Sequence, residues 1–278
     1  VIDVNRYPIP AIDEATKRTR KIGLGVMGVH DLLLMHGIPY DTEEARTLCH
    51  SVMETITEAA VKTSHKLARE DGSFPAWKGS IWEPRTMRNA ALTSIAPTGS
   101  ISLLAGCSGG IEPLYSFAYT RKKTVNAEFE MLHPLFARDL DAAVRSLCPS
   151  SAEADGRIRE VIRHVRATGT VQDIVWLPAS FRRLYKGALD IGWEDHIRMQ
   201  AVFQEHVHAS ISKTVNMPER ATREDVAAAV LFAWDSRLKG VTIYRTGSRK
   251  DVVLALGEGG EEEQPWPSVC CRPPEPTR

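Results

Sequence analysis

One short segment of the sequence combines hydroxyl-bearing residues and a glycine in a way that suits an anion. It consists of Ala96, Pro97, Thr98, Gly99, Ser100, Ile101 and Ser102. We expect it to follow a buried strand over residues 89–95, which are small or apolar, and to lead into one or two turns of helix over 101–105. A helix start offers unpaired N–H groups, and a glycine allows close approach of the backbone. We call residues 96–102 the anion loop, and phosphate is the anion that we expect it to bind.

The anion loop also has a simpler interpretation. Serine and threonine are common caps of any helix start, because their side-chain oxygens accept hydrogen bonds from the first free N–H groups. From the residue types alone, a capped helix after a strand is the favoured interpretation.

His206 and His208, with Glu205 beside them, are candidate metal ligands on one side of a strand. No cysteine or carboxylate cluster at ligand spacing accompanies them. We therefore predict ordinary histidines at a helix end and no metal site.

Gly23, Gly25 and Gly28 match the spacing of a dinucleotide-binding loop, G-x-G-x-x-G. That loop needs a strand in front of it, whereas residues 16–21 are charged and helical in pattern. We expect helix over 12–36 instead, with the glycines allowing close helix packing.

The remaining pattern predicts an α/β protein. A long helix is expected from Asp41 or Thr42 to near Gly72, and further helices over 126–169, broken at 149–151, and over 178–206, with a turn at 191–193. The last part predicts a strand from Ala209 to Val215, a helix from Thr222 to Trp234 and a strand at Val241 to Tyr244. This order is typical of a βαβ unit with parallel strands.

Composition narrows the class of protein. The chain has 278 residues, 35 basic and 35 acidic side chains, and 43% hydrophobic residues, as in a globular protein. A net charge of zero argues against a nucleic-acid partner. The sequence has no long apolar run and no signal peptide, so no membrane association is predicted. Five scattered cysteines indicate reduced thiols. A cytoplasmic location is therefore expected. The chain begins at Val1, which suggests a piece of a longer protein.

Three stretches carry a family resemblance. They are RKIGLGVMGVHDLL (20–33), NAALTSIAPTGSISLLAGCSGGIEP (89–113) and SKTVNMPERATREDVAAAVLFAWDSRLKGVTIYRTGSR (212–249). In this order they resemble the catalytic subunit of ribonucleotide reductase, and most of all its adenosylcobalamin-dependent class II form. The resemblance implies the C-terminal part of a ten-stranded α/β barrel with additional helices over residues 1–256. Residues 257–278 are rich in proline, glycine and glutamate and have too few apolar groups to pack, so a flexible tail is expected there.

The resemblance also implies a function, namely radical reduction of ribonucleoside diphosphates to 2′-deoxyribonucleotides. Residues 96–102 would hold the phosphates of the ribonucleotide substrate. Adenosylcobalamin would be bound mostly by a missing N-terminal half of the reductase, and a thioredoxin-type protein would supply electrons. The alternatives are a class I large subunit with a radical-generating partner and a non-catalytic nucleotide-binding or assembly module.

Some family features differ here. The Asn-x-Cys-x-Glu radical motif does not occur in these 278 residues, so no catalytic residue is predicted and the chain alone is expected to be inactive. Cys270 and Cys271 lie where the family carries a redox shuttle, but they are adjacent and a vicinal disulfide is strained, so the shuttle is the less favoured interpretation. Cys107 is expected to be structural, and Tyr244 either lies beside the radical site or is a core aromatic.

Overall fold

Extended segments that pair in parallel lie at the centre of the fold, and we call residues 22–24, 91–95, 209–217 and 242–245 together the wall. The computed structural model describes residues 1–122, 128–248 and 254–255. Leu24 forms a parallel bridge to Thr93, and Ile95 forms one to Ile211. Strand β3 (Thr214–Met217) continues from Ile211 and pairs in parallel with β4 (Thr242–Arg245), Thr214 lying opposite Thr242. The order across the wall is therefore 22–24, 91–95, 209–217 and 242–245, as in one side of an α/β barrel.

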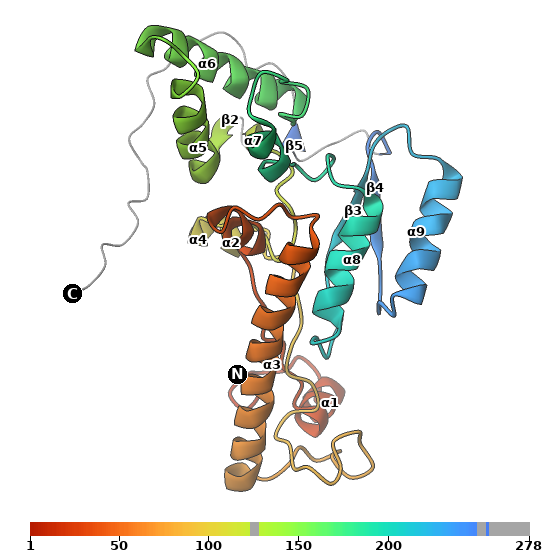
Figure 1. The fold of residues 1–278 in the computed structure, drawn as a ribbon. Helices are drawn as coiled ribbons and strands as arrows, with labels where there is room; N and C mark the ends of the chain where they lie inside the picture. Colours follow the sequence, from red (N-terminus) through yellow and green to blue (C-terminus); the bar gives the residue numbers. More distant parts are fainter. Residues whose placement is uncertain (123–127, 249–253, 256–278) are drawn as a thin grey trace, which may run out of the picture.

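Long helices cover this wall (Figure 1). Helix α3 (Glu43–Asp71) begins at Thr42, whose side chain accepts a hydrogen bond from the Ala45 N–H, and it ends at Gly72, as the sequence predicts. Helix α8 (Trp193–Gln204) lies beside α3, and Met53 of α3 shares one hydrophobic core with Phe203 of α8. Burying a side chain of this size contributes roughly 1.5–3 kcal/mol.

The predicted βαβ unit is confirmed. Helix α9 (Arg223–Asp235) connects β3 to β4 and packs against α8. Its start is a capping box, in which the Asp225 N–H donates to Thr222 Oγ1 at 3.2 Å and the Thr222 N–H donates to Asp225 Oδ2 at 2.8 Å.

A second lobe is formed mainly by the connection between residues 95 and 209. Its helices are α5 (Pro134–Arg145), α6 (Ser151–Thr168) and α7 (Ala179–Leu184). Strands β1 (Ala118–Lys122) and β2 (Glu128–Leu132) form an antiparallel hairpin, and β5 (Leu254–Ala255), from beyond this connection, pairs with the other edge of β1. Aromatic rings fill its core, including Phe117, Phe136 and Tyr185.

The hairpin corrects the expectation of helix over 126–169. Residues 128–131 read Glu-Phe-Glu-Met, an alternation with the period of a strand, although glutamate and methionine favour helices. Pairing with β1 decides the outcome. The break at 149–151 is confirmed, since it ends the turn between α5 and α6, and residues 191–193 form the turn into α8.

The expectation of a helix over 12–36 is also wrong in part. Helix α1 (Pro10–Thr19) ends at Arg20, residues 21–27 are extended or irregular, and α2 (Val29–Met35) follows. A Cβ on Gly25 would lie 2.2 Å from the Ser94 carbonyl oxygen. Gly25 therefore allows two extended backbones to meet, whereas Gly28, with a φ of 80°, is the left-handed N-cap of α2.

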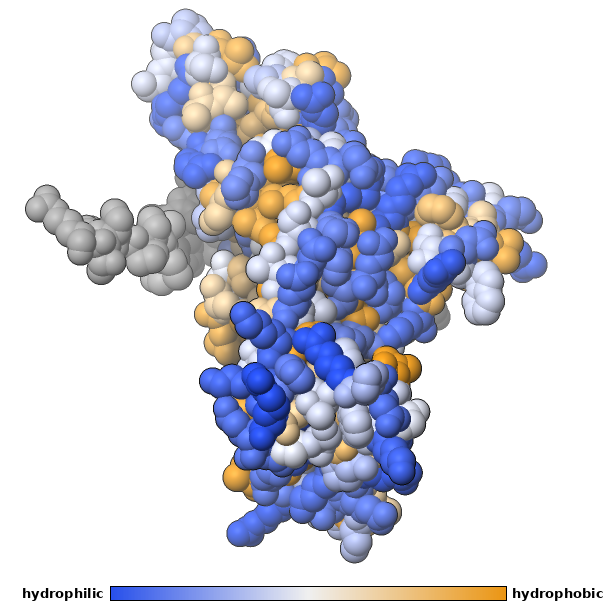
Figure 2. All heavy atoms as spheres, turned by 60° about the horizontal axis from the view of Figure 1, so that its bottom comes forward, coloured by the Kyte–Doolittle hydropathy of each residue, from blue (hydrophilic) through white to orange (hydrophobic). Residues whose placement is uncertain are grey.

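The remaining predictions concern helix α4, membrane association, the protein surface and the end of the chain. Helix α4 (Ile101–Ala105) forms where one or two turns are predicted. No helix in the described residues is long and apolar enough to cross a membrane. Hydrophilic residues cover much of the face seen in Figure 2. The boundary at residue 256, the tail and Cys270 and Cys271 lie outside the described residues.

Candidate functional site

The anion loop leaves the wall at the carboxyl end of residues 91–95. Ala96, Pro97, Gly99, Ser100 and Ile101 are exposed, whereas Ser102 is buried. The Ser102 N–H donates to the Thr98 carbonyl at 2.9 Å and closes the turn. Within the described part of the chain, the N–H groups of Gly99, Ser100 and Ile101 donate to no acceptor. The loop therefore presents consecutive free donors to solvent.

Ser100 is the N-cap of α4, but its side chain makes no capping hydrogen bond. The interpretation of the loop as a capped helix start therefore does not hold, because Ser100, the N-cap residue, does not cap α4. The Ser100 hydroxyl and the free N–H groups remain available to a ligand, which is the condition for an anion site.

Thr98 fixes the shape of the loop. It has a left-handed backbone with φ of 54°, which is unusual for a residue that carries a Cβ. Its Oγ1 accepts a hydrogen bond of 2.7 Å from the Gly110 N–H, and this bond offsets the strain. A left-handed residue among successive free N–H groups turns them toward a common centre, as in anion-binding nests.

The turn at Gly109 and Gly110 supports the loop from behind. A Cβ on Gly110, whose φ is 47°, would lie 3.0 Å from the Ala96 oxygen, and one on Gly109 would lie 3.2 Å from the Pro97 oxygen. No other residue type allows this approach without displacing the loop.

A partly buried carboxylate holds the same turn on its other side. Asp31 Oδ2 accepts from the Ser108 N–H, and Asp31 Oδ1 lies 2.6 Å from His133 Nε2. Burial alone would raise the pKa of Asp31, but the hydrogen bonds from His133 and Ser108 outweigh it and lower the pKa. The turn thus connects the anion loop to α2 and to the second lobe.

Cys107 lies in this turn, where a Cβ on Gly28 would come within 3.4 Å of the Cys107 Cβ. Burial and the charge of Asp31 raise the pKa of its thiol. A protonated thiol is a poor nucleophile, which agrees with a structural role.

A buried lysine lies farther along the wall. Lys213 Nζ lies 2.7 Å from His196 Nδ1, 2.8 Å from the Thr214 oxygen and 3.6 Å from Glu112 Oε2. His196 Nε2 donates to the Ala188 carbonyl at 2.9 Å, so Nδ1 is the acceptor for the lysine. Burial lowers the pKa of Lys213 to about 8 and that of His196 to about 3. The signal for this residue is in the sequence, since Lys213 occupies an apolar position in the alternation from 209 to 215.

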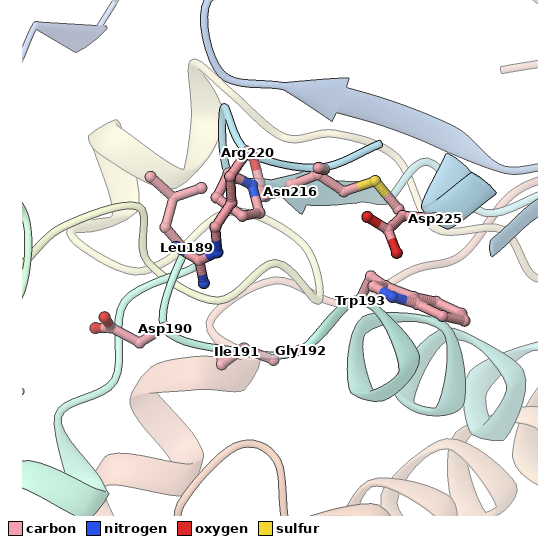
Figure 3. Close-up of a pocket in the computed structure, with 11 residues that line it drawn as sticks. Leu189, Asp190, Ile191, Gly192, Trp193, Asn216, Arg220 and Asp225 are labelled. Carbon is pink, nitrogen blue, oxygen red and sulfur yellow. The ribbon is translucent and has the colours of Figure 1, made fainter. Parts of the chain in front are cut away.

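A cavity of about 360 Å³ lies between the carboxyl end of β3 and the start of α8. Figure 3 shows Arg220 beside Leu189 and the Asp225 carboxylate near Trp193. Asp225 is already used in the capping box, and Asp190 accepts from Gly187 and Thr170. Arg220 has no ion pair within the described residues. Because parallel strands end at one edge, this cavity and the anion loop belong to the same side of the wall.

His206 and His208, which the sequence offers as candidate ligands, make separate contacts in the structure. His208 Nδ1 lies 2.8 Å from Thr93 Oγ1, and its ring lies against Trp82. His206 contacts His50 of α3 instead, with ring centroids 4.4 Å apart. Sequence reasoning missed His50, because no local pattern connects it to residues so far along the chain.

Tyr244 is half-buried on β4, opposite Asn216 of β3. Burial and the proximity of Tyr244 raise the pKa of Tyr115. Tyr244 therefore lies inside the wall region and is not a fully buried core residue. The predicted pair Cys270 and Cys271 is not among the described residues.

Comparisons with known proteins give a consistent result. The family model described as "Ribonucleotide reductase, barrel domain" matches residues 1–86 and 83–244. A vitamin B12-dependent ribonucleoside-diphosphate reductase of Mycobacterium tuberculosis (strain CDC 1551 / Oshkosh) is 45% identical over 259 residues, which cover 92% of this chain and 35% of that protein. A protein of the same description from Thermoplasma acidophilum is 40% identical and is covered over 32% of its length. The chain thus spans about a third of these relatives.

A solved structure shares the fold. The alpha subunit of the Actinobacillus ureae class Id ribonucleotide reductase superposes with a TM-score of 0.71 at 23% identity, over 88% of this chain and 43% of that one. The expected barrel-type α/β fold is confirmed by this match and by the family model.

Proposed function

Because the chain belongs to the barrel-domain family of ribonucleotide reductases, we propose that it works as part of a ribonucleoside-diphosphate reductase. The reaction replaces the 2′-hydroxyl of a ribonucleotide by hydrogen and yields a deoxyribonucleotide. In this proposal the anion loop, residues 96–102, binds the substrate phosphates. The observation that carries it is the group of free N–H donors at Gly99, Ser100 and Ile101 beside an uncapped Ser100 hydroxyl.

Each part of the loop has a separate task. The free N–H groups and the Ser100 hydroxyl donate to phosphate oxygens. Thr98 and Gly110 hold the donors in a fixed arrangement through their 2.7 Å hydrogen bond. Binding the charged end of the substrate orients the ribose, so that binding energy remote from the 2′-hydroxyl assists reaction at that position.

Both relatives are described as vitamin B12-dependent, which supports adenosylcobalamin as the radical source of the complete enzyme. Two cavities in the described residues, of about 360 and 340 Å³, are each too small to enclose a corrinoid, so these cavities do not fit that cofactor. Further parts of the reductase and a thioredoxin-type reductant would complete the reaction.

Titration of the chain with cytidine diphosphate and with cytidine tests the phosphate site. We expect the diphosphate to bind at least about tenfold more tightly, since hydrogen bonds to charged groups contribute roughly 1.5–3 kcal/mol each. Gly99→Pro removes one free N–H and should abolish this preference. Ser150→Ala is the matched control, because Ser150 caps α6 with its side chain and lies in the other lobe. Equal binding of the two ligands by the unmodified chain would exclude the proposed site.

A second experiment separates the possible reaction classes. Ribonucleoside diphosphate reduction is measured with adenosylcobalamin and dithiothreitol, using the chain alone and mixed with a polypeptide that carries the Asn-x-Cys-x-Glu segment. Activity that needs the mixture and the cofactor supports the class II assignment. Activity that needs a metal-containing second subunit supports class I, and phosphate binding without activity in a folded, associated mixture supports a non-catalytic module.

A further inference from the structure

We propose that His50, Glu205 and His206 form a binding site for a divalent transition-metal ion, with Zn²⁺ as the best fit. Their ligand atoms lie within 4.8 Å of one another. His50 comes from α3, and Glu205 and His206 follow the last turn of α8. The site would connect two helices that lie side by side in Figure 1.

The distances leave room for an ion between the side chains. His50 Nε2 and Glu205 Oε2 are 3.6 Å apart, which is too long for a hydrogen bond. Two ligand atoms on a tetrahedral zinc ion, each about 2.0–2.1 Å from the metal, are separated by about 3.3 Å. Small side-chain rotations would therefore bring the three groups into coordination.

Unused bonding capacity on His206 supports the site. Neither ring nitrogen of His206 has a hydrogen-bond partner among the described residues, and its Nε2 is buried. A buried polar atom without a partner is unfavourable, and a metal ion would supply the missing partner. The backbone of His206 is held in place, because Thr57 Oγ1 and Thr93 Oγ1 both donate to its carbonyl, at 2.8 and 3.2 Å.

The carboxylate of Glu54 lies near His50, on the side of its second ring nitrogen. Glu54 Oε2 is 4.0 Å from His50 Nδ1, one helical turn along α3. Carboxylates commonly accept the second ring N–H of a metal-binding histidine and orient it. Glu54 is placed for this role.

The set of donors selects the kind of ion. Two imidazoles and one carboxylate suit Zn²⁺ and related transition metals, whereas Mg²⁺ and Ca²⁺ prefer oxygen ligands. The His50 and Glu205 side chains are 41% and 63% exposed, so a fourth position remains open to water. Because the ligands come from separate helices, the ion would stabilise the packing of α3 against α8.

The test is a Zn²⁺ titration combined with thermal unfolding, in a background in which Cys270 and Cys271 are serine so that this adjacent pair of thiols does not compete. We expect one equivalent of Zn²⁺ to bind and to raise the Tm, because the ion binds only the folded state. His50→Ala and His206→Ala should abolish both effects. Glu54→Gln should weaken binding by about tenfold, the lower end of the cost of losing such a partner.

Two further variants keep the result interpretable. Glu205→Gln changes an exposed side chain, so it should weaken Zn²⁺ binding without altering the fold. His164→Ala is the control, since His164 pairs with Asp173 at 2.9 Å without a third ligand, and its removal should change nothing. Zn²⁺ binding that persists in folded His206→Ala or Glu205→Gln, or an unmodified chain whose Tm does not respond to Zn²⁺, would refute the site.

Discussion

Helices α4 and α9 both start after a strand of the wall with a hydroxyl residue as N-cap, yet they use it differently. At α9, Thr222 Oγ1 accepts from the Asp225 N–H, and the Asp225 carboxylate accepts from the Thr222 N–H. At α4, Ser100 caps nothing, and the N–H groups of the loop remain free. The same residue type therefore stabilises one helix and remains available to a ligand at the other. The difference appears only when each backbone donor is assigned a partner.

Acidification should have the largest effect, because it unfolds the chain and both helix starts are then lost together. Burial lowers the pKa of His30 and of His196 to about 3, so both stay neutral in the folded chain and take up protons on unfolding below pH 6.5. Stability should fall as the pH drops from 6.5 toward 3, by up to about 2.7 kcal/mol per pH unit for two protons. Denaturant unfolding at several pH values measures this slope.

The control for this effect is His30→Asn. The asparagine oxygen can replace His30 Nδ1 as acceptor of the Leu114 N–H, which it bonds at 2.8 Å, but it takes up no proton. The slope should therefore fall by about half in this variant. An unchanged slope would show that His30 does not contribute.

Gly110→Ala should disturb the anion loop and spare the capping box. The added Cβ would lie 3.0 Å from the Ala96 oxygen in a left-handed backbone, at a cost of about 2 kcal/mol. We expect lower stability and loss of the preference for cytidine diphosphate over cytidine. The control is Gly99→Ala, since no atom lies within 4 Å of a Cβ there and the N–H is kept. Retained diphosphate preference in Gly110→Ala would show that this turn does not shape the site.

Removing the hydroxyl group at each of the two helix starts should have the smallest effects, but it compares the two sites most directly. Thr222→Ala should lower the free energy of unfolding by about 1 kcal/mol and leave nucleotide binding unchanged, because it removes a working cap. Ser100→Ala should change stability by less than about 0.5 kcal/mol, as expected for an exposed side chain outside such features, and weaken cytidine diphosphate binding. Chemical denaturation and ligand titration of both variants provide the four values. The reverse pattern would mean that Ser100 is an ordinary cap.

Features fixed by neighbouring residues were predictable from the sequence. Thr42 and Thr222 mark the starts of α3 and α9, and the anion loop lies after a parallel extended segment, as its residues indicate. The extended stretch around Gly25 was missed, because the reason for its glycine is a contact with Ser94. The proximity of His50 to His206 was missed for the same reason, since tertiary packing alone creates it.

The order of strands in the wall has a consequence for how the chain folds. Neighbouring strands bring together Leu24 with Thr93 and Ile95 with Ile211, so each pairing closes a long loop. The helices of the second lobe lie within one of these loops, and α5 and α6 pack against each other over a short stretch of sequence. Loop closure carries an entropic cost before its contacts form, which slows topologies rich in distant contacts. The lobe is thus positioned to form early, and the wall that carries the anion loop is completed late.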